Sequence, residues 1–567
     1  MQKSITARIR AAASGLILAG LMSASAASAA AATPPVVKTA GGPVQATARG
    51  EMVSYFAIPF AAPPVGDLRW RAPQPAARWK APIARGKSAS PCLQTGGENA
   101  FRSRTDSEDC LYLDVHAPAA KGRYPVMVWI HGGAFTTGDA STYSDPSPLV
   151  SRGVIVVTVQ YRLGAMGFMA HPALRDAGGS AGNYGIMDQQ AALKWVRANI
   201  SRFGGDARNV TIFGESAGGF SVLTHLASPL SKGLFDKAII QSGAYGVDGQ
   251  KTQAAMETAS AAALSAAMSG QDAGPACAKD PASAACLRTL PDGLVRSRLM
   301  SGFGKGVGNL VPSVDGRVLP ATVKDIFAAG RNNRVPVING ANEDEMRLFL
   351  ALSEMGARLR SKPPNFNPAD KSFLLTADGY AASARQAEST QGIPVGALTE
   401  RYYPLSRFGD DPALAPSLAS AAASTDSTFS CNGINVSSRI AAQGKPTWMY
   451  EFRDQTAPPL VGNFGGRYIL SLPQGAAHAS ELSYLFIPKG ANPTAEQKAL
   501  QATMATYWTN FARSGDPNGA GAPAWEAFGK GSVQALDVAS GGGVAGMTAD
   551  AFRDQHLCRS AWSGLTF

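Results

Sequence analysis

The chain has 567 residues, of which 45% are hydrophobic and 16% are charged, so it can bury a large core. Its formal net charge of +11 is carried by scattered lysines and arginines with no long basic run, which indicates a solvated cationic surface and no nucleic-acid partner. About 150 residues per domain would give three or four domains. The spread of motifs along the chain favours instead one catalytic domain over residues 33–567, built on a single sheet.

Residues 1–32 are predicted to be a cleaved signal peptide. Lys3, Arg8 and Arg10 precede an apolar stretch at 11–24, and Ala27-Ser28-Ala29 fits an A-x-A cleavage site. The stretch is shorter than the ~20 residues that span a bilayer, although an uncleaved anchor is the alternative. Cleavage would lower the formal charge from +11 to about +8, because three cations and no acid are removed. We expect a secreted or periplasmic protein without stable membrane insertion.

Several short runs rich in β-branched residues predict buried strands. These runs lie at residues 126–130, 154–159, 210–213, 238–240, 335–338 and 448–450. Between the second and third runs, apolar residues recur at helical spacing over 187–203. Strands that alternate with helices predict an α/β fold with a central, mostly parallel sheet flanked by helices.

Two long segments interrupt this alternation. Residues 246–334 and 351–430 are rich in Ala, Ser, Gly and Pro, and structureless loops of that length are uncommon. We expect helical insertions that cap the carboxyl edge of the sheet, over an active site. The stretch from Pro523 onward, with Gly541-Gly542-Gly543, is expected to be a loop-rich end of the chain.

The motif Gly214-Glu215-Ser216-Ala217-Gly218 predicts a nucleophile. The strand at 210–213 leads directly into it, and Phe220, Val222, Leu223 and Leu226 continue as an apolar helix. Strand, tight turn and helix are the setting of a nucleophile elbow, in which the turn holds the serine hydroxyl out at the sheet edge. The helix N-terminus behind the serine favours negative charge.

A serine nucleophile needs a base, and the chain offers six histidines: His116, His131, His171, His225, His478 and His556. In elbow hydrolases the base follows the serine and the acid in the chain. His225 lies in the helix that begins at the elbow and is expected to point away, whereas His556 lies in the terminal tail. His478, in a loop of small residues after the last predicted strand, is therefore the expected base.

The acid should follow a strand between Ser216 and His478. The run at 335–338 leads into Glu343-Asp344-Glu345, and spacing alone leaves all three open. Backbone donors for an oxyanion are predicted at His131-Gly132-Gly133-Ala134-Phe135, directly after the first strand, and at Ala217.

Six cysteines form an even set, as expected in an oxidising compartment, and sequence alone permits fifteen pairings. None has the C-x-x-C spacing of a zinc or redox site, so we expect no metal. The proposed chemistry needs no organic cofactor either.

Together these motifs resemble the type B carboxylesterase family, the cholinesterase-like branch of the α/β hydrolases, over about residues 36–558. The segment 213–219 is similar to the active-site signature of that family, and 108–115 is similar to its second signature, with Asp114 where Asn is usual. Further similar segments are 63–66 and 199–206.

The resemblance implies a Ser-Glu-His triad of Ser216, Glu345 and His478, and oxyanion donors at Gly133, Ala134 and Ala217. Family members usually have glycine where this chain has Ala134, whose methyl group would narrow the pocket. The resemblance also implies three disulfides: Cys92–Cys110, Cys277–Cys286 and Cys431–Cys558.

Choline esters are not expected as substrates. Cholinesterases carry a choline-binding tryptophan before the second signature, and here that region reads Asn99-Ala100-Phe101-Arg102. A quaternary ammonium group needs an aromatic cage, whereas Arg102 would favour neutral or anionic esters.

The predicted function is hydrolysis of small-molecule carboxylic esters through an acyl-enzyme intermediate. The alternatives are hydrolysis of an amide, carbamate or lactone with the same triad, and a non-catalytic adhesion protein of the same fold. The sequence leaves the natural substrate and the oligomeric state open.

Overall fold

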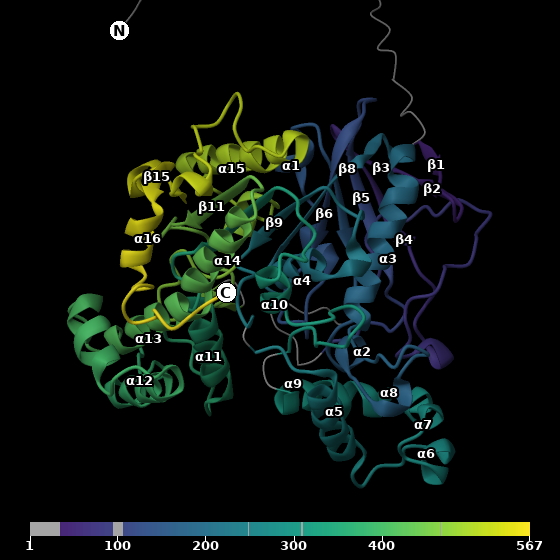
Figure 1. The fold of residues 1–567 in the computed structure, drawn as a ribbon, viewed down its shortest axis with the longest axis horizontal. Helices are drawn as coiled ribbons and strands as arrows, with labels where there is room; N and C mark the ends of the chain where they lie inside the picture. The colour runs from purple at the N-terminus through teal and green to yellow at the C-terminus, as the bar shows by residue number, and fades with distance from the viewer. Residues whose placement is uncertain (1–34, 95–105, 248, 308–309, 465–466) are drawn as a thin grey trace, which may run out of the picture.

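The computed structural model describes residues 35–94, 106–247, 249–307, 310–464 and 467–567 (Figure 1). The predicted signal peptide at 1–32 and the segment around Arg102 lie outside the described residues.

An eleven-stranded sheet runs through the centre of the molecule in the order β15-β14-β11-β10-β9-β8-β6-β7-β5-β4-β3. Neighbouring strands are parallel from β7 to β14 and antiparallel at both edges. The strands are β3 (Thr47–Arg49), β4 (Met52–Pro59), β5 (Tyr112–Pro118), β6 (Tyr124–Ile130), β7 (Ile155–Val159), β8 (Gly205–Glu215), β9 (Lys237–Gln241), β10 (Val337–Asn342), β11 (Thr447–Phe452), β14 (Ser532–Leu536) and β15 (Ala545–Thr548). Two small hairpins, β1 (Val36–Lys38) with β2 (Pro43–Gln45) and β12 (Asn463–Phe464) with β13 (Arg467–Tyr468), stand apart from this sheet.

Strand β6 shows why the central strands are continuous apolar runs in the sequence. Val126, Val128 and Ile130 enter the core on one face of the sheet, and Met127 and Trp129 enter the core on the other. Successive side chains of a strand point to opposite faces, so a strand covered on both faces must be apolar at every position. This pattern is what made the strands predictable.

Helices cover both faces of the sheet. One face packs against α3 (Tyr184–Asn199), α4 (Ala217–Ala227) and α14 (Cys431–Ala442), and α10 (Val323–Ala328) packs on α4 and α14. The other carries α1 (Ser147–Val150) and α15 (Ala495–Ser514), which contact each other. The predicted α/β architecture with a mostly parallel sheet is confirmed.

The two insertions are helical, as predicted. The first contains α5 (Gln253–Met268), α6 (Pro275–Lys279), α7 (Ala284–Thr289), α8 (Asp292–Leu294) and α9 (Met300–Val307). The second contains α11 (Arg347–Arg360), α12 (Ala377–Gln391), α13 (Ala415–Thr425) and the π-helix η9 (Asp426–Ser430). Because they follow β9 and β10, they leave the sheet at its carboxyl edge, and both groups of helices gather in the lower part of Figure 1.

The C-terminal end is less loop-rich than predicted, because it completes the main sheet. Strand β14 extends the main sheet parallel to β11, β15 pairs antiparallel with β14, and α16 (Ala549–Gln555) follows. All five residues of β14 are buried, but the strand is short and contains Ser532 and Gln534. The triple glycine is the connection between two sheet strands.

Candidate active site

Ser216 lies at the tip of a sharp turn between β8 and α4. Its backbone has a φ of 56° and a ψ of −123°, a conformation that costs a non-glycine residue roughly 1–3 kcal/mol and persists only when the surroundings impose it. The Ser216 N–H donates to the carbonyl of Gln241 at 2.9 Å, and its own carbonyl accepts from Phe220 N–H at 2.8 Å. Two backbone bonds therefore hold the strained residue in place.

The glycines of this turn are required by close backbone packing. A Cβ atom on Gly218 would lie 1.9 Å from the carbonyl oxygen of Ile130, and one on Gly214 would lie 2.6 Å from the same atom. A Cβ on Gly132 would lie 3.0 Å from the Cβ of Ser216. The nucleophile turn and the loop after β6 thus pack directly against each other.

The loop after β6 has the geometry of an anion-binding backbone. Gly133, Ala134 and Phe135 have φ values of 106°, 52° and 57°, three successive residues in the left-handed region. Within the described parts of the chain, the N–H groups of Gly133 and Ala134 donate to no backbone carbonyl. Such successive N–H groups form a concave site for negative charge. Ala217 lies at the first position of α4, where N–H groups have no partner within the helix.

His478 is held by Glu345. The Nδ1 atom of His478 donates to Oε2 of Glu345, and the His478 N–H donates to the Glu345 carbonyl at 3.2 Å. The other oxygen of Glu345 accepts from the Ser242 hydroxyl at 2.5 Å and from the Asn342 N–H at 2.8 Å. Glu345 is fully buried, and the bonds from Ser242 and Asn342 hold in place the carboxylate that contacts the imidazole ring.

The second nitrogen of His478 lies close to Glu215. His478 Nε2 lies 3.1 Å from Glu215 Oε1, and neither atom has a hydrogen-bond partner within the described residues. The structure therefore brings His478 and Glu345 together, but it contains no bond from the Ser216 hydroxyl to His478. Such bonds are often long in free enzymes and tighten when substrate binds.

Three buried carboxylates surround the imidazole, and two of them escaped prediction. Burial raises the pKa of Glu215 to about 8. The charge of His478 lowers this pKa, whereas the charges of Glu481 and Glu345 raise it further. Burial likewise raises the pKa of Glu481 to about 7. Burial lowers the pKa of His478, but Glu215 and Glu345 outweigh burial and raise it to about 9. Glu215 lies inside the predicted nucleophile motif, and this position is the only sequence feature that could have pointed to it.

Aromatic side chains from the insertions lie beside the His478 ring. The rings of Phe349 on α11 and Phe429 on η9 each lie 5.1 Å from the ring of His478. The ring of Tyr245 lies 5.7 Å from Phe429. The Tyr245 hydroxyl is buried with no hydrogen-bond partner among the described residues. Burial raises the pKa of Tyr245, and the Ser216 side chain partly offsets that rise. None of these rings was predicted, because only tertiary packing brings them here.

The other two histidines after Ser216 are occupied elsewhere. The ring nitrogens of His225 lie 2.9 Å from the Ser231 hydroxyl and from Gln189 Oε1. His556 lies between two carboxylates, those of Asp426 and Glu451. Neither histidine is bonded to Ser216.

All six cysteines form disulfides. The pairs are those that the resemblance implies: Cys92–Cys110, Cys277–Cys286 and Cys431–Cys558.

Among the described residues, no cluster of His, Cys, Asp or Glu has an arrangement that could hold a metal ion. No helix in the same residues combines the length and the apolar composition needed to cross a membrane.

Comparisons with known proteins place the chain in a family. The family model described as carboxylesterase family matches residues 33–552. Carboxylesterase 1D of Rattus norvegicus is 36% identical over 539 residues, which cover 88% of each chain. Fumonisin B1 esterase of Sphingopyxis macrogoltabida is 33% identical and covers 86% of this chain, with 84% of the relative covered. A solved structure titled PNB esterase has a TM-score of 0.70 at 29% identity, and covers 92% of this chain and 100% of that one.

Proposed function

Because the chain belongs to the carboxylesterase family and is a carboxylic ester hydrolase, we propose that it cleaves small-molecule esters through an acyl-enzyme with Ser216, Glu345 and His478 as triad. The observation that carries this proposal is the bond between His478 Nδ1 and the fully buried Glu345. This bond leaves Nε2 as the only ring nitrogen that can accept a proton. The strained turn at Ser216 supports its role as nucleophile.

In the proposed first step, His478 Nε2 takes the proton from the Ser216 hydroxyl as its oxygen attacks the ester carbonyl. The N–H groups of Gly133, Ala134 and Ala217 stabilise the oxyanion. His478 then protonates the departing alcohol, and a water activated by the same nitrogen releases the acid. Glu345 holds the ring and stabilises its positive charge throughout.

For His478 to act, its Nε2 must turn from Glu215 toward Ser216 or receive the proton while contacting both. Burial raises the pKa of Glu215, and the charge of His478 acts against that rise. When this carboxyl takes up a proton, it competes less for the ring than a carboxylate does. The proposal therefore assigns the proton-accepting role to Nε2 although the Ser216 bond is absent from the free enzyme.

We also propose that residues 33–567 form one catalytic domain exported by a cleaved leader at 1–32. The family match over 33–552 supports the first part. The absence of free cysteines from the described residues supports export, since disulfides persist in oxidising compartments.

The test is pre-steady-state hydrolysis of p-nitrophenyl esters of increasing acyl length, with the matching anilides as amide substrates. We expect a burst of p-nitrophenol equal to the enzyme concentration, slow or no anilide turnover, and no burst in Ser216→Ala or Glu345→Gln. Equal activity in wild type and Ser216→Ala would overturn the proposed mechanism. Faster anilide than ester turnover would favour amide cleavage with the same triad.

A further inference from the structure

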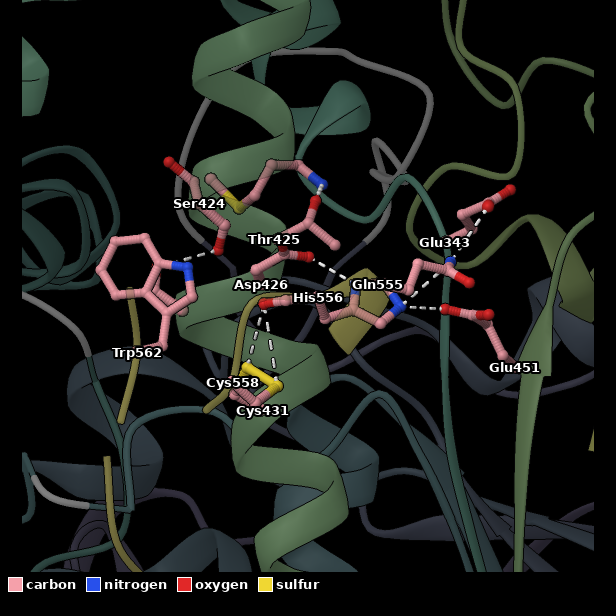
Figure 2. A network of polar contacts seen from close by, with 12 residues as sticks. Glu343, Ser424, Thr425, Asp426, Cys431, Glu451, Gln555, His556, Cys558 and Trp562 are labelled. Carbon is pink, nitrogen blue, oxygen red and sulfur yellow. Dashed lines mark hydrogen bonds and ion pairs between the residues drawn. A yellow bond between two sulfur atoms is a disulfide. The ribbon is translucent and has the colours of Figure 1, made fainter. Parts of the chain in front are cut away.

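A second buried histidine sits behind the catalytic acid. His556 is 3% exposed; its Nδ1 lies 2.5 Å from Asp426 Oδ1 and its Nε2 lies 2.5 Å from Glu451 Oε1 (Figure 2). Ionised carboxylates only accept hydrogen bonds, so both ring nitrogens carry protons and the ring is an imidazolium. Both nitrogens are thereby closed to metal binding and to base catalysis.

The two carboxylates belong to different elements. Asp426 opens η9, and its second oxygen accepts from the Tyr403 hydroxyl at 2.7 Å. Glu451 lies on β11, and its second oxygen accepts from Arg453 Nε at 2.6 Å. His556 is thus the shared partner of a helix from the second insertion and a strand of the main sheet, as Figure 2 shows.

The loop that carries Glu345 is bonded to the two residues that adjoin these carboxylates in the chain, Phe452 and Thr425. On one side, the Glu343 N–H donates to the carbonyl of Phe452, next to Glu451, at 2.9 Å. On the other side, the Met346 N–H donates to the hydroxyl oxygen of Thr425, next to Asp426, at 3.1 Å. The loop 343–346 is therefore bonded on one side to β11 and on the other to the end of α13, directly before η9.

A disulfide fixes the segment that presents His556. The sulfur atoms of Cys431 and Cys558 lie 3.4 and 3.8 Å from the carbonyl oxygen of His556 (Figure 2). Cys431 begins α14 directly after η9. The histidine is therefore tied to the end of η9 through its backbone as well as through its ring.

We propose that His556 is a positioning residue, whose imidazolium draws η9 and β11 together and so fixes the loop that aims Glu345 at His478. This inference rests on the proposed function, in which Glu345 is the triad acid. Its effect is carried through two hydrogen bonds, from the Glu343 N–H to a backbone carbonyl and from the Met346 N–H to the Thr425 hydroxyl, and not through contact with the substrate. Because η9 also carries Phe429 against the ring of His478, the same device supports the base.

A double-mutant cycle tests the inference, with kcat for a p-nitrophenyl ester and the rate at which an organophosphate labels Ser216 as readouts. In the wild-type background, His556→Gln should lower both rates about tenfold and change KM less than about twofold, since small misplacements of a catalytic group reduce turnover. In the Glu345→Gln background, the same substitution should change neither rate, because the residue it positions is already disabled.

The control is His116→Gln, at a buried histidine on β5 whose Nδ1 lies 2.9 Å from the Ser54 hydroxyl. It should lower the thermal midpoint and leave kcat unchanged. Should His556→Gln fail to fold, Thr425→Val removes the acceptor for Met346 and leaves His556 in place, and it should lower kcat in the same background-dependent way.

Two results would overturn the inference: an equal loss of rate from His556→Gln in both backgrounds, or a lower thermal midpoint with kcat unchanged. Either result leaves the proposed function standing if Glu345→Gln is itself much slower than the wild type. If Glu345→Gln keeps the wild-type rate, the triad assignment and this inference fall together.

Discussion

The Nε2 atom of His478 lies 3.1 Å from Oε1 of Glu215, while Nδ1 of the same ring is bonded to Glu345. The imidazole is thus held between two buried carboxylates, and in the proposed mechanism the proton from Ser216 must reach the nitrogen that faces Glu215. Both carboxylates act against burial and raise the pKa of His478 to about 9. Since only the neutral ring can accept a proton, this contact sets the pH range in which the enzyme works.

We expect Glu215→Gln to move the acid limb of kcat/KM to lower pH. In the wild type, kcat/KM should rise with pH until His478 loses its proton, and removing the Glu215 charge removes one cause of its raised pKa. The measurement is kcat/KM against pH between about pH 5 and about pH 10, with spontaneous hydrolysis subtracted. An acid limb that stays in place, or moves to higher pH, would contradict this reading of the contact.

Gly218→Ala should damage the nucleophile turn. The new Cβ would meet the carbonyl oxygen of Ile130 at 1.9 Å, so the turn must shift, at an expected cost of about 1–3 kcal/mol in the free energy of unfolding and more than about tenfold in kcat. Gly293→Ala is the matched control, because a Cβ there meets no atom within 4 Å. Similar kcat values for the two variants would show that the close contact does not hold the turn.

The disulfides should differ in their contribution to stability according to loop length. Cys431–Cys558 closes a separation of 127 residues and Cys277–Cys286 one of 9; the chain-entropy model assigns about 5 and about 3 kcal/mol to them. Denaturant unfolding of the Cys431→Ser/Cys558→Ser pair variant should therefore show the larger loss against wild type. The reverse order of the two pair variants would mean that loop closure is not the main cause.

His556 should make stability fall at alkaline pH. Burial lowers the pKa of His556, but Glu451 and Asp426 outweigh it and raise the pKa to about 10, above the ~6.5 of an unfolded histidine. A raised folded-state pKa gives stability that is fully present below about pH 6.5 and is lost as pH rises through about 10. Urea unfolding of wild type and His556→Gln across this range should show a steeper alkaline decline in the wild type. Parallel declines would contradict the imidazolium assignment.

The parts of the fold that sequence could predict are those with a local signature. Strand β6 is apolar at every position because both of its faces are covered, and the turn at Ser216 is marked by glycines that close packing requires. Strand β14 carried no such signature, since it is five residues long with two polar members. Its place in the sheet is decided by pairing with β11, far earlier in the chain.

The choice of the proposed triad acid likewise depends on the folded structure and not on local sequence. Glu343, Asp344 and Glu345 are equivalent by spacing, and only the folded chain separates them, because Glu345 faces His478 while Glu343 and Asp344 accept from Gln455. The resemblance to a family supplied the choice that spacing left open. Glu215 and Glu481 were missed because burial, which raises their pKa values, is a property of the assembled core.

The most direct test of the triad is covalent trapping of the nucleophile. We expect one equivalent of a phosphonylating inhibitor to inactivate the enzyme, and peptide mapping to place the adduct on Ser216. Ser216→Ala should take up no label and show no burst of p-nitrophenol, while its thermal midpoint stays near that of the wild type. Labelling of another residue together with full esterase activity in Ser216→Ala would contradict the assignment of Ser216 as the nucleophile.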